Sequence, residues 1–69
     1  MNEMVKFYKE QYPKGTRIEL ISMADDFAVP SGTKGTVVHV DDMGTIHMQW
    51  DNGRTLGLIP EADEFIVIE

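Results

Sequence analysis

Two histidines and an aspartate are the residues of this sequence whose types and spacing could hold a metal ion. His39 and His47 stand on either side of a turn-like stretch that begins with Asp41. If the chain reverses there, the two imidazoles face each other on neighbouring strands, with Cβ atoms about 5 Å apart. Zinc accepts two imidazoles and a carboxylate with one position left open. The alternative is a solvated polar face, and we expect no bound metal or cofactor.

A second group of residues indicates peptide binding. Asp25, Asp26 and Phe27 fall in a long connection, residues 24–33, and long loops in compact domains are often functional. In peptide-binding SH3 folds, an acidic loop beside aromatic residues receives a basic or proline-rich segment. Trp50 could add a recognition aromatic. The alternatives are that Phe27 packs against its own domain and that Trp50 fills the core at the end of its strand.

The N-terminal stretch, residues 2–11, predicts a short amphipathic helix capped by Asn2. Its apolar side would carry Met4, Phe7 and Tyr8, with Tyr12 just beyond. A helix this short needs a surface to pack on. That surface is either its own domain or another chain. In the first case the protein is a monomer; in the second, the helix forms a homodimer contact or docks on another protein.

Catalysis finds no support in the residue types. The chain has no cysteine, and Ser22 and Ser31 have no local context of a nucleophile. No glycine-rich stretch has the order of a phosphate-binding loop. We therefore expect a protein that is not an enzyme.

The stretch from Gly35 to Ile59 predicts three consecutive strands joined by two tight turns, at residues 41–44 and 51–53. Three-residue loops ending in Gly44 and Gly53 place all the large apolar residues on one face. They pair Asp41 with Thr45, Val40 with Ile46, Val38 with Met48, Trp50 with Arg54, Met48 with Leu56 and Ile46 with Leu58. A two-residue second loop would turn two leucines outward, which costs roughly 3–6 kcal/mol.

The remaining elements complete an all-β fold. A first strand is expected at residues 16–23, a one-turn helix at 60–63 and a closing strand at 64–69, whose apolar run predicts burial on both faces. Five strands in this order predict a small five-stranded SH3-like barrel. Residues 1–12 would form the N-terminal helix and residues 13–69 the barrel domain.

Length and charge limit the function classes. The chain has 69 residues, no cysteine and a net charge of −6. It contains neither an apolar run of membrane-spanning length nor a leader-like N-terminus, so we expect a cytoplasmic protein without membrane contact. An acidic domain repels phosphate backbones, which disfavours nucleic-acid binding and favours a basic partner.

Four short patterns together resemble a known family: Pro-x-Gly-Thr at 13–16, Gly-Thr-x-Gly-x-Val at 32–37, Val-Asp-Asp-x-Gly at 40–44 and Trp-Asp-x-Gly-Arg at 50–54. They are similar to small bacterial and phage proteins catalogued as domain of unknown function 4314. The resemblance covers residues 12–65. It implies an origin in a bacterium or its mobile elements and implies no activity. Our leading hypothesis is a non-catalytic protein or peptide interaction module; the alternatives are a nucleic-acid-associated barrel and metal binding at the histidine pair.

Overall fold

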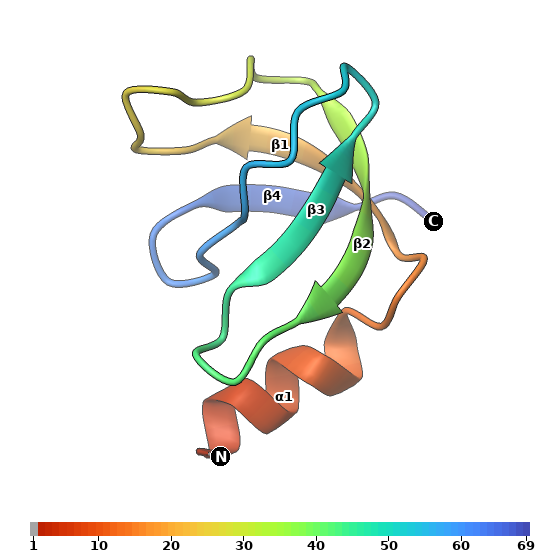
Figure 1. Ribbon diagram of the computed structural model, residues 1–69, viewed down its shortest axis with the longest axis vertical. Helices are drawn as coiled ribbons and strands as arrows, with labels where there is room; N and C mark the ends of the chain where they lie inside the picture. Colours follow the sequence, from red (N-terminus) through yellow and green to blue (C-terminus); the bar gives the residue numbers. More distant parts are fainter. Residues whose placement is uncertain (1) are drawn as a thin grey trace.

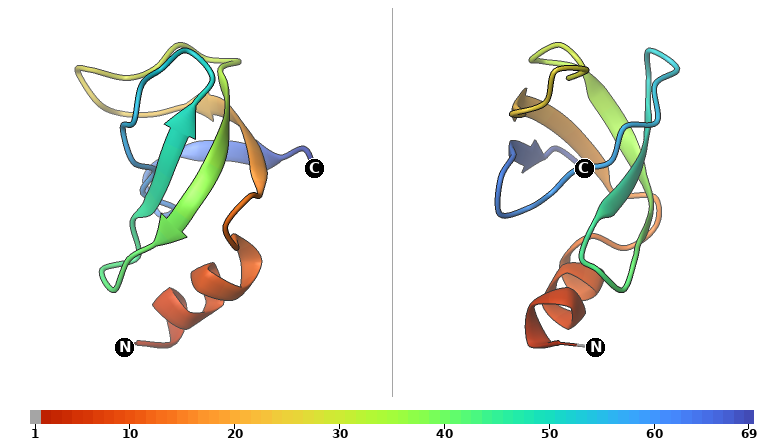
Figure 2. Two further views of the ribbon diagram at one scale, coloured as in Figure 1. Left: turned by 45° about the vertical axis from the view of Figure 1, so that its right-hand side comes forward. Right: turned by 60° about the vertical axis from the view of Figure 1, so that its left-hand side comes forward.

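The computed structural model describes residues 2–69, which form one helix packed at the end of an antiparallel sheet (Figure 1). Its elements are α1 (Glu3–Gln11), β1 (Arg17–Ser22), β2 (Lys34–Val40), β3 (Ile46–Trp50) and β4 (Glu64–Val67). The four strands pair in the order β3-β2-β1-β4, so β3 and β4 lie at opposite margins of the sheet (Figure 2).

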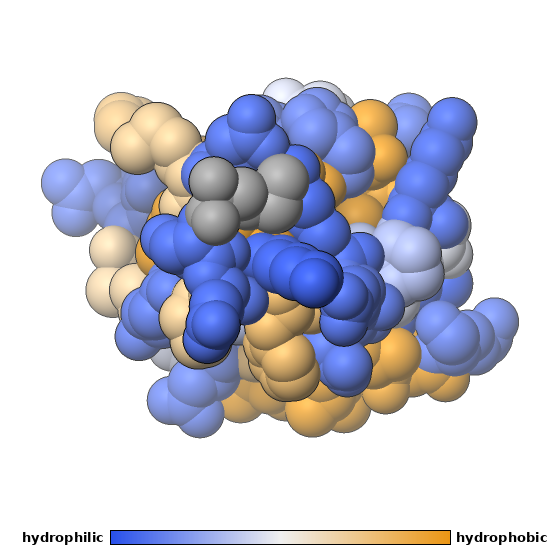
Figure 3. All heavy atoms as spheres, turned by 90° about the horizontal axis from the view of Figure 1, so that it is seen from below, coloured by the Kyte–Doolittle hydropathy of each residue, from blue (hydrophilic) through white to orange (hydrophobic). Residues whose placement is uncertain are grey.

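The predicted N-terminal helix is confirmed, together with its cap. The Asn2 side chain accepts a hydrogen bond from the Val5 N–H at 2.8 Å, which satisfies one of the helix's first unpaired donors. The predicted apolar side is partly wrong. Val5 and Tyr8 are buried, whereas Met4 and Phe7 are about half exposed. Seen from the helix end, hydrophilic side chains occupy much of the visible face, and apolar ones are visible along the lower border and in smaller areas at the left and the upper right (Figure 3).

Both three-residue turns are confirmed. Asp41 donates its N–H to the Thr45 carbonyl at 3.0 Å, and Trp50 donates to the Arg54 carbonyl at 2.8 Å. The third residue of each loop, Gly44 or Gly53, has a φ of 88° or 90°, a conformation that glycine adopts without steric cost. The turn chemistry therefore sets the register of the chain at both reversals.

The predicted pairing of Val38 with Met48 is wrong because β2 contains a bulge. Val37 is opposite Met48 and His39 is opposite His47, so Val38 is an extra residue on β2. A bulge reverses which residues face inward. Val37 is 1% exposed and Val38 is 41% exposed, the opposite of the predicted arrangement.

The five-stranded SH3-like barrel is also wrong: the described residues form an open sheet of four strands. The expected strand at 54–59 is reduced to a single bridge, in which Ile46 and Leu58 exchange two hydrogen bonds of 2.9 Å. The next pair would need the Leu56 carbonyl, but that carbonyl accepts the Trp50 indole N–H at 2.7 Å. Leu56 makes this hydrogen bond with the Trp50 side chain, and the predicted pairing of Met48 with Leu56 does not form.

The core lies against one face of the sheet. Its fully buried side chains come from all three of the strands β1 to β3 and from the segment after β3: Trp50, Ile18, Leu20, Ile46, Met48, Leu58 and Val37. Leu58 therefore faces inward with Ile46 and Met48, as predicted, while Leu56 is only partly buried and lies outside the core cluster.

The end of the chain differs from the expectation in two ways. Residues 60–63 form a turn, closed by the Asp63 N–H on the Ile59 carbonyl at 2.8 Å, rather than a helix. β4 is not buried on both faces, because Ile66 and Val67 are 49% and 50% exposed. Within residues 2–69, no helix has the length and apolar character needed to cross a bilayer.

Candidate functional site

The long loop between β1 and β2 presents Phe27 to solvent. The Phe27 side chain is 76% exposed, and Asp25 and Asp26 beside it are exposed as well. Phe27 does not pack against its own domain, which rules out the alternative interpretation of this residue. The structure places these three residues in one loop, as the sequence predicted.

Hydrogen bonds hold the Phe27 backbone in place. Its N–H donates to Asp25 Oδ1 at 2.7 Å, and its carbonyl accepts a hydrogen bond from Arg54 Nη2, on the loop after β3. Two residues further on, Val29 is 2% exposed and belongs to the core. The loop is therefore anchored on both sides of an exposed aromatic ring.

The other predicted binding aromatics lie in or against the core. Trp50 is 1% exposed, and its indole N–H is satisfied by Leu56, so it is a core residue rather than a ligand platform. Tyr8 is buried, and its hydroxyl donates to Glu61 Oε1 at 3.0 Å. Tyr12 is partly buried between Tyr8 and Phe65, with ring centroids 6.4 and 5.4 Å away. Of the four predicted binding aromatics, Phe27 is therefore the exposed one.

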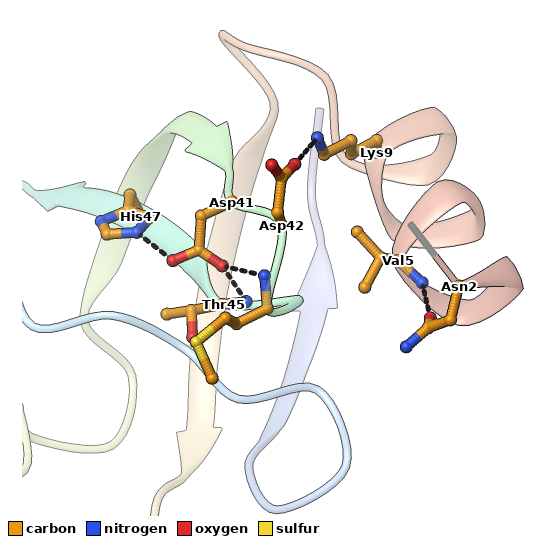
Figure 4. A network of polar contacts seen from close by, with 8 residues as sticks. Asn2, Val5, Lys9, Asp41, Asp42, Thr45 and His47 are labelled. Carbon is orange, nitrogen blue, oxygen red and sulfur yellow. Dashed lines mark hydrogen bonds and ion pairs between the residues drawn. The ribbon is translucent and has the colours of Figure 1, made fainter.

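The histidine pair forms as predicted on the outer face of the sheet. The His39 and His47 rings stack with centroids 4.4 Å apart and an interplanar angle of 6°. His47 Nε2 lies 2.7 Å from Asp41 Oδ2 (Figure 4). Asp41 Oδ1 accepts the N–H groups of Met43 and Thr45 at 2.9 and 3.0 Å. The hydrogen bond with His47, followed by the backbone bond from Thr45, lowers the pKa of the Asp41 carboxyl.

The hydrogen bonds of Asp41 stabilise the turn, and the side chains of Asp41, His39 and His47 are not directed at a common point where a metal ion could bind. A histidine ligand binds along the lone pair in the plane of its ring, and two parallel stacked rings place those lone pairs in separate, nearly parallel planes. The Asp41 carboxylate is already engaged by three donors. Among residues 2–69, no group of three or more histidine, aspartate or glutamate side chains is placed to hold a metal.

Two ion pairs connect elements for which the sequence predicted no contact. Lys9 on α1 contacts Asp42 in the β2–β3 turn at 2.7 Å, and the bond lowers the pKa of Asp42 (Figure 4). Arg17 on β1 donates to both oxygens of Asp51 at 2.8 and 2.7 Å. The pairing of β1 with β2, together with that of β2 with β3, places Arg17 within reach of Asp51, so the spacing along the chain carries no signal of this contact.

The fold and the exposed loop define a small antiparallel β domain with an N-terminal helix, whose surface features are turns, an exposed aromatic and an open sheet edge. The chain belongs to the family described as domain of unknown function (DUF4314), whose family model matches residues 1–68. This match confirms the resemblance seen in the sequence. No curated protein and no solved structure shows significant similarity to the chain.

Proposed function

We propose that this chain is a non-catalytic protein-interaction module that binds a basic segment of a partner protein through the loop carrying Phe27. The observation that supports it is a large aromatic side chain, 76% exposed, on a backbone fixed by Asp25 and Arg54. Aromatic residues dominate the energetics of protein interfaces, and a fixed loop reduces the entropy lost on binding.

Charge indicates the kind of partner. Asp25 and Asp26 directly precede Phe27, Arg54 donates to the Phe27 carbonyl, and the whole chain carries a net charge of −6. Complementary charge steers encounter and selects against like-charged partners. A segment with lysine or arginine next to an apolar residue matches this surface, whereas the phosphate backbone of a nucleic acid does not. The likeness to small bacterial and phage proteins supports a setting in the bacterial cytoplasm, with a host or a mobile element as the source.

To test this proposal, the full chain is immobilised and peptides that bind it are selected from a display library of random sequences. We expect recovered peptides to be rich in lysine and arginine and to lose affinity when Phe27 is truncated to alanine. Loss of a central aromatic contact costs about 2 kcal/mol or more, which is about 30-fold in Kd.

Met43→Ala is the matched control, because Met43 is 89% exposed on a different loop. It should leave the affinity unchanged. Equal affinity of the Phe27→Ala and unaltered chains, or preferential binding of single-stranded RNA with a steep loss at higher salt, would overturn the proposal.

A further inference from the structure

β4 leaves one side of its backbone unpaired at the margin of the sheet. β1 pairs with one side of β4, and no other strand of the described residues lies beyond it. The Ile68 N–H donates to the Arg17 carbonyl at 3.0 Å, so the backbone of Ile68 faces β1. Backbone groups alternate in direction along an antiparallel strand. The N–H and C=O groups of Phe65 and Val67 therefore point away from β1.

The side chains at this edge are apolar on both faces. Val67 is opposite Ile18 and shares the inner face of the sheet, yet it is 50% exposed. Ile66 is opposite Glu19 on the outer face and is 49% exposed. Proteins commonly protect sheet edges with lysine, proline, bulges or short strands; residues 64–67 contain no lysine and no proline, and the bulge of this ladder lies on β1. An added strand would cover both aliphatic side chains and satisfy the outward backbone groups.

Acidic residues flank this apolar centre. Residues 55–69 contain four carboxylate side chains and no lysine or arginine. Two of them serve the fold: Asp63 Oδ2 accepts the Ile59 N–H at 2.8 Å, and Glu61 accepts the Tyr8 hydroxyl. The other two, Glu64 and Glu69, stand at opposite ends of the strand and make no hydrogen bond through their side chains with residues 2–69.

We infer that the free edge of β4 binds an extended segment of a partner protein that has apolar residues at alternate positions and lysine or arginine at both ends. This surface goes beyond the Phe27 loop of the proposed function and shares no residue with it. A second copy of the chain fits less well. Symmetric pairing about Ile66 would place Asp63 opposite Glu69, and like charges directly opposite are destabilising.

The experiment measures amide hydrogen exchange of the full chain with a model peptide, acetyl-Lys-Lys-Val-Thr-Ile-Thr-Val-Lys-Lys-amide. We expect the amides of Phe65 and Val67 to exchange about tenfold more slowly at a peptide concentration about ten times Kd. A peptide of the same apolar sequence with glutamate at both ends should bind more weakly, and added salt should reduce that difference.

A pair of variants at one position isolates the backbone contribution. Val67→Pro removes a donor that β1 does not use, and proline is tolerated where the strand N–H faces solvent. Val67→Thr keeps the donor. We expect the proline variant to bind the peptide up to about tenfold more weakly, as loss of one hydrogen bond predicts, and the threonine variant to bind within about threefold.

Two peptides N-methylated at alternate residues provide a test on the unaltered chain. One pattern blocks the amides that face β4 and should abolish binding, while the other should bind normally. Equal binding of both, or unchanged exchange at Phe65 and Val67 at saturating peptide, overturns the inference. If the amides of Phe65 and Val67 exchange slowly without peptide, and more slowly as the protein concentration rises, a second copy of the chain occupies the edge. That result also overturns the inference. Phe27→Ala should not alter this binding, which separates failure here from failure of the proposed function.

Discussion

Gly35 lies against Trp50, and this contact makes Gly35→Ala a quantitative test of the core. The two residues are opposite each other on β2 and β3. A methyl group at Gly35 would lie 2.7 Å from Trp50 Cε3 and 3.1 Å from the Gln49 carbonyl oxygen. Favourable contacts between carbon atoms occur at about 3.5–4.0 Å, so the ring has to move. The hydrogen bond to Leu56 and complete burial oppose that movement.

The expected cost follows from two opposing effects. Overpacking a core costs about 1–3 kcal/mol. Replacing glycine by alanine restricts the unfolded chain, which returns about 0.4–1 kcal/mol. We expect a net loss of about 1.5 kcal/mol in the free energy of unfolding, which lowers the Tm of a domain of this size by about 6–12 °C.

A double-mutant cycle with Trp50→Phe assigns the cost to the contact. Phenylalanine lacks the second ring that contains Cε3, so Gly35→Ala should cost at least 1 kcal/mol less in the Trp50→Phe background, within the range of roughly 0.5–3 kcal/mol seen for contacting residues. Urea unfolding followed by circular dichroism is the assay, because Trp50→Phe removes the tryptophan fluorescence.

Gly57→Ala serves as the control. Its added methyl group would lie 2.8 Å from Thr45 Cγ2, the end of a side chain that can rotate away. It should cost less than Gly35→Ala and show no coupling to Trp50→Phe. The reasoning is refuted if Gly35→Ala costs the same free energy with tryptophan and with phenylalanine at position 50.

Three further predictions concern the polar contacts around α1 and the first hairpin. The pKa of the Asp41 carboxyl is lowered from 3.8, chiefly by its bond with a histidine, so its contribution to stability is present above about pH 4 and is lost as the pH falls through the lowered pKa. Urea unfolding of Asp41→Asn should therefore depend less steeply on pH in the acid range. Asn2→Ala should lower the free energy of unfolding by about 0.5–2 kcal/mol through loss of the helix cap, and equal Tm values would contradict the cap. Tyr8→Phe removes a hydrogen bond and should cost about 0.5–1.5 kcal/mol, whereas Tyr12→Phe, whose hydroxyl has no hydrogen-bond partner among residues 2–69, should be neutral in the same thermal scan.

Local chemistry made several features predictable from the sequence. Asp and Gly in the two turns specify reversals, and Gly44 and Gly53 adopt the required positive φ. Asn2 satisfies a donor only three residues away, so the helix start is a local matter too. The facing histidines followed from the turn length, because residues at equal distances from a hairpin loop lie opposite each other.

The candidate binding residues were only partly predictable. The position of an aromatic residue along the chain does not determine whether its ring is buried against the rest of the domain. In the structure Phe27 is exposed, whereas Trp50 and Tyr8 are buried. The free edge of β4 was missed because an unbroken apolar run is typical of a strand covered on both faces. Whether a neighbouring element covers such a strand depends on contacts between distant parts of the chain.

The sequence by itself determined where the chain turns and where the helix begins, since each depends on residues close together along the chain. It also determined the family, because a family match compares residue types along the chain and requires no contacts. The tertiary structure alone decided the bulge at Val38, which turns Val37 inward and Val38 outward. It also decided that the Leu56 carbonyl accepts the Trp50 indole N–H and that the sheet has four strands and stays open. These outcomes arise from competition between distant groups for the same space and the same hydrogen-bond acceptors, which no local pattern encodes.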